Sequence, residues 1–160
     1  MTYLDPKDAV FGSAATCYVT MKNQKGEDER YQMFTITDFE AKFAPNIKEV
    51  KILGKTTSGH KAAGGKGTFS GKMYYNTSIF RKWAIDYIKT GVMQPFQIDV
   101  TNKDKTSSIG SQTICYYGCL LDNIVLSKFT AGDDLLEEDI SGTFDDSDMP
   151  EEFTELAGMR

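Results

Sequence analysis

The residues best suited to chemistry lie in a glycine- and lysine-rich stretch at positions 55–71, KTTSGHKAAGGKGTFSG. Such stretches bind phosphate in P-loop proteins, whose pattern is Gly, four residues and then Gly-Lys-Ser/Thr. The nearest frame here starts at His60 instead of a glycine, and Gly67 replaces the hydroxyl residue that binds magnesium. A P-loop also leads into a helix whose N-terminus holds the phosphate, whereas a strand-like run follows this stretch. We therefore expect no nucleotide site.

Catalysis by this chain would depend on His60, because it is the only histidine. Ser58 lies close to it and could serve as a nucleophile, but no carboxylate stands nearby in the stretch to orient the imidazole. Distant residues can complete a Ser-His-Asp triad in a folded protein, so a hydrolase that uses His60 remains an alternative. Our prediction is that the chain is not an enzyme.

The cysteines do not form a metal-binding or disulfide pattern. There are three of them, Cys17, Cys115 and Cys119, and an odd number argues against a disulfide framework. Cys115 and Cys119 are four residues apart in a strand-like run, which is about 13 Å and too far for a bridge. With one histidine and no Cys-x-x-Cys motif, little remains for a zinc site. We expect neither metal nor cofactor, and we interpret the cysteines as small core residues.

Charge is distributed unevenly along the chain. Residues 1–132 contain 17 basic and 12 acidic residues, and residues 133–160 contain one basic and 11 acidic residues, so their net charges are +5 and −10. Five lysines lie in or just before the glycine-rich stretch: Lys48, Lys51, Lys55, Lys61 and Lys66. They lack the interleaved aromatics and arginines of a nucleic-acid grip. We interpret this segment as an arm that contacts another protein, with the acidic end of the chain as the candidate surface; a solvated acidic tail is the alternative.

Hydrophobic periodicity predicts a mainly β domain, an antiparallel sandwich or barrel with one flanking α-helix. Strands are expected at residues 15–22, 30–43, 68–76, 95–101, 112–129 (with a bend near Gly118 or Asp122) and 137–145. A long loop is expected at 45–67. The helix is expected at 77–91, capped by Asn76 or Thr77 and ended by Gly91. Its apolar stripe is formed by Ile79, Phe80, Trp83, Ala84, Tyr87 and Ile88.

The order of three segments resembles the tail tube proteins of contractile phage tails, in particular those of PBSX-type prophages. The segments are the loop and helix block at residues 51–91, the run FQIDVTNKDKTSSIGSQTICYYGCLLDNIVLSKF at 96–129 and the acidic LLEEDISGTFDD at 135–146. Within them, the Leu-Gly…Gly-His-Lys…Gly-Lys-Gly loop, the helix start Ser-Ile-Phe-Arg-Lys and the Val-Thr-Asn-x-Asp motif match the family. The likeness covers about residues 15–146.

This resemblance implies a fold similar to that of the type VI secretion tube protein, with six copies in a ring and rings stacked into a hollow tube. Residues 1–146 would form the tail tube domain, with the long loop 45–67 reaching a neighbouring subunit or the adjacent ring. Residues 147–160 would form an acidic C-terminal arm. The residues expected in the contact between subunits are Lys48, Lys51, Lys55, Gly59, His60, Lys61, Gly64, Gly65 and Lys66.

The resemblance also implies a setting. The partners would be further copies of the chain, a sheath protein, and tape measure and baseplate or initiator proteins. The particle would assemble in the cytoplasm of a host bacterium, and DNA would pass without specific binding if the particle is a phage. An acidic strand would line the lumen and repel DNA phosphates; its candidate residues are Glu137, Glu138, Asp139 and Asp145.

A monomeric β-sandwich module that binds a carbohydrate or a receptor is the alternative from a different class of function. Such a site would need exposed aromatic side chains, and the adjacent pairs Tyr74–Tyr75 and Tyr116–Tyr117 are candidates. Neighbouring residues of a strand point to opposite faces, so we expect half of these rings to lie in the core. No apolar run approaches the roughly 20 residues that span a bilayer.

Overall fold

The computed structural model describes residues 2–160 and contains eight strands and one α-helix. The elements are η1 (Pro6–Asp8), β1 (Ala15–Lys22), β2 (Asp28–Gln32), β3 (Ile36–Val50), β4 (Gly59–Tyr74), α1 (Ile79–Thr90), β5 (Phe96–Lys103), β6 (Ser111–Asn123), β7 (Glu137–Phe144) and β8 (Asp146–Glu151). No described helix is long and apolar enough to cross a membrane. The mainly β architecture with one helix confirms the predicted fold class.

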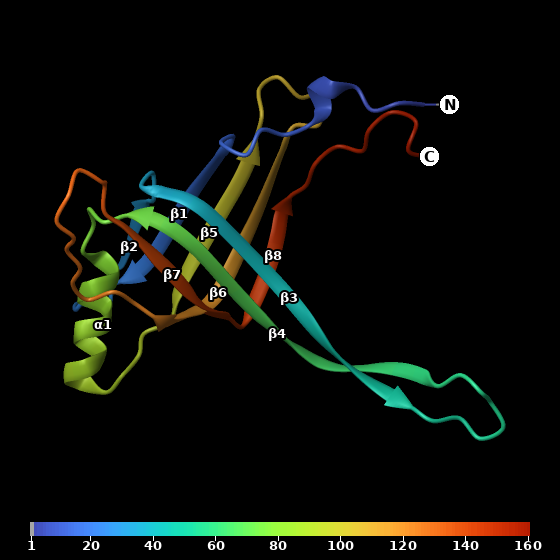
Figure 1. Cartoon of the computed structure of the whole chain (residues 1–160), viewed down its shortest axis with the longest axis horizontal. Coiled ribbons are helices and arrows are strands. Elements are labelled where there is room, and N and C mark those ends of the chain that lie inside the picture. Colours follow the sequence, from blue (N-terminus) through green and yellow to red (C-terminus); the bar gives the residue numbers. More distant parts are fainter. Residues whose placement is uncertain (1) are drawn as a thin grey trace.

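All strand pairs are antiparallel, and the strand order is β2-β1-β5-β6-β7-β4-β3, with β8 also paired to β6. Strand β6 joins two halves of the sheet, because its first part pairs with β5 and β8 and its end pairs with β7. Gly118, which has φ of 66°, lies where β6 changes partners. The sheet therefore bends at β6 and folds over a single core (Figure 1).

The core lies between the two halves of the bent sheet and under α1. Phe69 of β4 links them, since its ring lies 6.1 Å from that of Phe39 and 6.4 Å from that of Phe96. The most deeply buried side chains are Val19, Met73, Ile98 and Cys119. Alternate residues of β1, β5 and β7 point inward, as expected for strands with one face in the core.

Helix α1 packs on the core through Phe80 and Ala84, which are buried. Trp83 stands edge-on to Phe96 at 5.8 Å, and its Nε1 donates to the Gln94 carbonyl at 2.7 Å. Gly91 ends the helix with φ of 72°, as predicted. The N-cap is Ser78, so the caps predicted at Asn76 or Thr77 were wrong by one or two residues.

The later part of the predicted helical stripe does not reach the core. Tyr87 and Ile88 are exposed, and Ile88 is 67% exposed. The buried residues of α1 end at Ala84, so the last turn of the stripe does not pack on the core. This part of the prediction was wrong.

The loop predicted at residues 45–67 is instead a β-hairpin. Strands β3 and β4 remain paired from Ile36 and Met73 to Val50 and Gly59, and only residues 51–58 form the turn. Periodicity failed here because both faces of the hairpin are exposed, so burial imposes no alternation on its side chains.

Three other predicted boundaries changed. The predicted strand 30–43 is divided between β2 and β3, the strand predicted to reach residue 129 ends at Asn123, and the predicted C-terminal arm begins inside β8. Half of the residues of β8 are acidic and all six are exposed, so its sequence lacks the apolar alternation that marks a half-buried strand.

Met73 tests the position of the core. We expect Met73→Ala to lower the free energy of unfolding by about 2–5 kcal/mol, because Met73 is completely buried and its loss leaves a cavity. Urea unfolding followed by circular dichroism measures this, with the exposed Met149→Ala as the matched control. Equal effects of the two substitutions would contradict the assigned core.

Candidate functional site

The most prominent surface feature is a projecting hairpin arm, which we define as residues 44–66. The pairing of β4 with β7 stops at Gly67 and Phe144, and beyond this point β3 and β4 continue as a hairpin away from the body (Figure 1). Large apolar side chains on it face solvent, including Ile47 at 55% and Leu53 at 103% exposed. An isolated two-stranded hairpin is at best marginally stable in water. The arm therefore has the properties of a segment that packs against a partner.

The glycines of the arm serve hairpin geometry rather than phosphate binding. A Cβ at Gly65 would lie 2.4 Å from Cζ of Phe43, so only glycine lets this ring cross the strand. Gly64 has φ of 74° and lies beside the register shift between Pro45 and Ile47. Such a bulge bends and twists a hairpin, which sets the direction in which the arm leaves the body.

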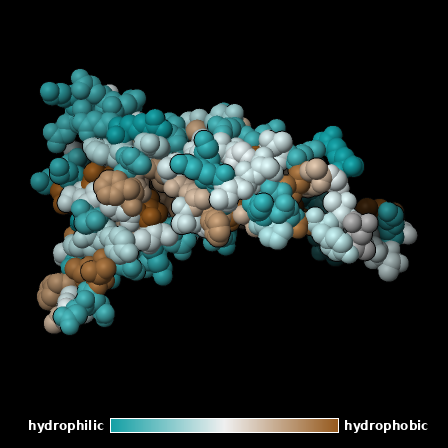
Figure 2. All heavy atoms as spheres, turned by 90° about the horizontal axis from the view of Figure 1, so that it is seen from above, coloured by the Kyte–Doolittle hydropathy of each residue, from teal (hydrophilic) through white to brown (hydrophobic). Residues whose placement is uncertain are grey.

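The arm is basic, with five lysines and one glutamate and a net charge of +4. Lys48 and Lys61 are directly opposite one another in the ladder, an arrangement that destabilises a hairpin on its own. Within residues 2–160, none of the five lysines forms an ion pair. Figure 2 shows hydrophobic and hydrophilic atoms side by side at the end of the long axis that carries the arm tip.

The structure gathers all the residues predicted for the contact between subunits on this arm. Gly59 is half-buried, and the other members of the set are exposed: Lys48, Lys51, Lys55, His60, Lys61, Gly64, Gly65 and Lys66. His60 is opposite Glu49 in the ladder and away from the core.

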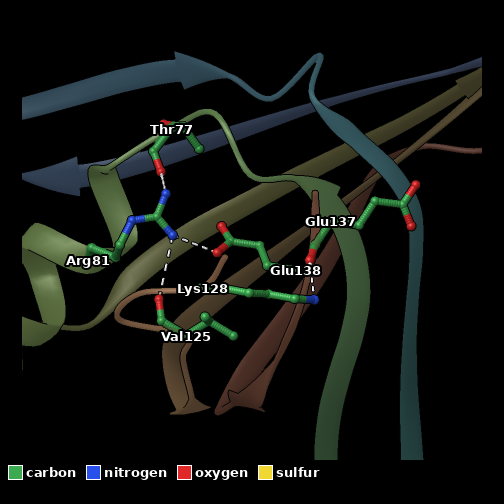
Figure 3. Close-up of polar contacts among 6 residues, drawn as sticks. All are labelled: Thr77, Arg81, Val125, Lys128, Glu137 and Glu138. Carbon is green, nitrogen blue, oxygen red and sulfur yellow. Dashed lines mark hydrogen bonds and ion pairs between the residues drawn. The ribbon is translucent and has the colours of Figure 1, made fainter. Parts of the chain in front are cut away.

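The predicted acidic strand needs one correction. Glu138 is only 4% exposed and cannot face a lumen, because inward and outward residues alternate along β7. Glu137 and Asp139 are exposed, and Figure 3 shows the Glu137 side chain pointing away from that of Glu138. Asp145 follows β7 and is exposed. The run of acids in the sequence concealed this alternation.

Glu138 instead forms a buried ion pair that sequence reasoning missed. Its carboxylate accepts a hydrogen bond from Arg81 Nη1 of α1 at 2.5 Å (Figure 3). Arg81 also donates to the carbonyls of Thr77 and Val125, and its guanidinium lies 4.2 Å from the centre of the Tyr75 ring. The pair therefore anchors α1 to β7. The one available signal was an arginine within a helix whose other basic residues are lysines.

Strand β8 is the second feature that sequence reasoning missed. Among the described residues it pairs only with β6, and its six residues are all exposed. Residues 145–152 contain five carboxylates and no basic residue. Within residues 2–160 the molecule thus has a basic arm with no strand on either side and an acidic edge strand that lacks a partner on one side.

Comparison with known proteins shows the family to which the chain belongs. Residues 2–151 match the model of a family described as phage tail tube protein, DUF2001. The chain belongs to the phage tail tube protein family. It is 32% identical over 124 residues to the phage-like element PBSX protein XkdM of Bacillus subtilis (strain 168), covering 78% of this chain and 84% of that protein. The uncharacterized protein YqbM of the same strain is 32% identical over 121 residues, covering 76% and 82%.

Solved structures agree on the fold. A chain from the sheath/tube terminator of an extracellular contractile injection system, PVC, superposes with a TM-score of 0.63 at 12% identity, covering 89% of this chain and 97% of that one. A chain of the PVC sheath-tube complex in the extended state gives a TM-score of 0.62 at 11% identity, covering 88% and 90%. As a member of a structural tail tube family, this protein is not an enzyme.

The tyrosines of this tail tube protein do not form an exposed aromatic platform. Tyr75 lies under the Arg81 guanidinium, and Tyr116 packs against Phe144 with ring centres 4.9 Å apart. Tyr74 is exposed on β4. An open groove of about 590 Å³ between α1 and the β1–β2 turn includes Trp83 and Glu29 in its lining. The arrangement therefore gives no support to the carbohydrate-binding alternative.

The three cysteines of the tail tube protein are free thiols; Cys119 is buried, and Cys17 and Cys115 are half-buried. Burial, and secondarily the charge of Asp99, raises the pKa of Cys17 to about 12. Burial also raises the pKa of Cys119 to about 12 and that of Cys115 to about 11. No group of potential metal ligands occurs among residues 2–160.

The coupling between Arg81 and Glu138 can be tested by comparing the loss of one charge with the loss of both. We expect Arg81→Leu to destabilise the fold by about 3–5 kcal/mol, because it leaves the Glu138 charge buried without a partner. The double variant Arg81→Leu/Glu138→Leu should be less damaging than Arg81→Leu alone, since it removes both charges. Urea unfolding of both single variants and the double variant completes the cycle, and strictly additive effects would contradict a coupled pair.

Alkylation tests the environment of the thiols. The thiolate is the reactive form, so raised pKa values favour the unreactive thiol throughout the neutral range. At pH 8 we expect Cys17 and Cys119 to react with iodoacetamide at least about a hundredfold more slowly in the native protein than in urea. Peptide mass spectrometry separates the sites. Rapid native labelling of Cys119 would contradict its assigned burial.

Proposed function

We propose that this chain is the subunit of the inner tube of a contractile phage tail or phage-tail-like particle, in which hexameric rings stack around a channel. The match of residues 2–151 to the tail tube family carries the proposal. The chain would build a conduit and perform no reaction.

Strand edges and the arm give this proposal physical support. Unpaired edges associate readily with other chains, and the arm exposes apolar groups and lysines that find no partner within residues 2–160. A head-to-tail contact repeated between identical copies closes a ring or continues as a helical filament. A tube of stacked rings needs contacts between subunits within a ring and contacts between successive rings. The arm is the segment that would reach a neighbouring subunit.

We place the outward face of β7 toward the channel. Glu137 and Asp139 are exposed on it, and Asp145 follows at its end. Carboxylates along a channel would repel DNA phosphates and allow DNA to slide without binding. In a headless particle the same tube would pass ions across an envelope.

The partners follow from the same proposal. Chains of similar fold occur in the sheath-tube complex of an extracellular contractile injection system and in the baseplate of the anti-feeding prophage. We infer that this subunit contacts further copies of itself, a sheath protein, and tape measure and baseplate or initiator proteins. It would assemble in the cytoplasm of a host bacterium and remain in the tail of the particle.

Shortening the arm tests the proposal. Residues 47–62 can be replaced by Asn-Gly, which favours a tight hairpin turn and keeps the register of the remaining pairs. We expect a folded subunit whose melting temperature changes by a few degrees but which forms no stacked tubes, because the arm supplies the contact between neighbours.

Negative-stain electron microscopy and sedimentation velocity of the full-length and shortened proteins make the measurement. The control is a similarly exposed change in the body, Phe34→Ala, which should assemble normally. Full-length tubes from the shortened protein would contradict a role for the arm.

A further inference from the structure

Besides β2 and β3, whose outer sides end the sheet, parts of β4 and β8 have an open edge among residues 2–160. Strand β4 pairs with β7 only between Gly67 and Tyr74, so residues 59–66 pair with β3 on one side and have no strand on the other. Strand β8 pairs with β6 on one side and likewise has no second neighbour among residues 2–160. Each edge exposes backbone donors and acceptors that another strand can satisfy.

The two edges carry opposite charge. The β4 side of the arm contains Lys61 and Lys66 and no acid, whereas β8 contains Asp146, Asp148 and Glu151 and no base. None of these five groups forms an ion pair within residues 2–160. The Asp146 and Asp148 carboxylates accept only the backbone N–H of the next residue. Both edges therefore hold charges that remain free for an outside partner.

One chain cannot bring the two edges together. They separate at the last pair between β4 and β7, Gly67 and Phe144, and from there the arm runs away from the body while β8 follows β6 (Figure 1). A second copy of the chain can match these charges along their length. A contact between two different surfaces of identical chains is head-to-tail, which is the kind that builds rings and filaments.

We propose that β8 is the docking strand for the β4 side of the arm of a neighbouring copy, held by backbone pairing and by attraction between lysines and carboxylates. Ala62, Ala63, Gly64 and Gly65 have small or no side chains, so the arm edge presents little steric hindrance to close approach. This inference rests on the proposed tube function and specifies which surfaces meet. Docking of the arm tip in the groove beside α1 is a competing outcome of the test below.

A charge swap tests the contact. The variants are Lys61→Glu/Lys66→Glu on the arm, Asp146→Lys/Asp148→Lys on β8, and the combination of all four. We expect each reversal alone to lower the assembled fraction about tenfold, because like charges then face one another, and the combination to restore it to within about threefold of wild type. The control Lys103→Glu/Lys105→Glu changes the charge equally on exposed residues outside both edges and should assemble as wild type.

Cross-linking gives a second readout that requires no variant to fold. Subunits labelled with ¹⁴N and ¹⁵N are mixed under assembly conditions and treated with a carbodiimide, which joins lysines to carboxylates without a spacer. Links of mixed isotope between Lys61 or Lys66 and Asp146 or Asp148 support the proposal. Rings or tubes whose arm lysines link elsewhere, for example to Glu29 in the groove, overturn this contact and leave the tube function standing. Monomers without any mixed-isotope link overturn both.

Discussion

The backbone hydrogen-bonding groups of a β-sheet require partners, and this requirement governs how the strands of this protein are arranged. The body satisfies its polar backbone groups by bending a single sheet at β6 over a common core. The outer sides of β2 and β3, which end the sheet, are not satisfied in this way, and neither are the arm, which has left the body, and β8, which has a neighbour on one side only. A protein with long open edges aggregates unless those edges are blunted or used. This chain carries charge on the arm and on β8, and the opposite signs favour one specific contact over indiscriminate association.

If these edges form contacts between copies of the chain, the body has to hold them in fixed positions. The ion pair between Arg81 and Glu138 meets this need, since it connects α1 to β7 inside the protein. Both groups are largely buried, and the carbonyls of Thr77 and Val125 and the Tyr75 ring surround the guanidinium. A buried ion pair stabilises a fold less than the short distance between its charges suggests, because both charges lose their water. Removing only one partner is costly, since the other charge then stays buried alone. The pair therefore fixes the position of the helix relative to β7, whose outer face we assign to the channel.

The reactive side chains of the molecule are few, and none of them forms a recognisable site among residues 2–160. The single histidine lies on the exposed arm, burial raises the pKa of the thiols, and the glycines that resemble a phosphate loop allow a hairpin to bend. Gly65 illustrates the point, because the Phe43 ring occupies the space that any other side chain would need. The glycines that first suggest a ligand site are thus explained by the geometry of the hairpin backbone.

The fold class, the helix with its end at Gly91 and the family could be predicted from the amino-acid sequence alone, because these follow from local patterns and ordered motifs. The sequence also located the residues of the arm, although as a loop, since a hairpin exposed on both faces leaves no hydrophobic period. Which acidic side chains of β7 face solvent could be seen only in the folded structure. Glu138 is buried against Arg81 while Glu137 beside it is exposed, and this difference depends on a helix 57 residues away in the chain. The status of β8 as an open edge was likewise invisible in the sequence, because strand pairing is a contact between distant segments and its acidic residues bury nothing.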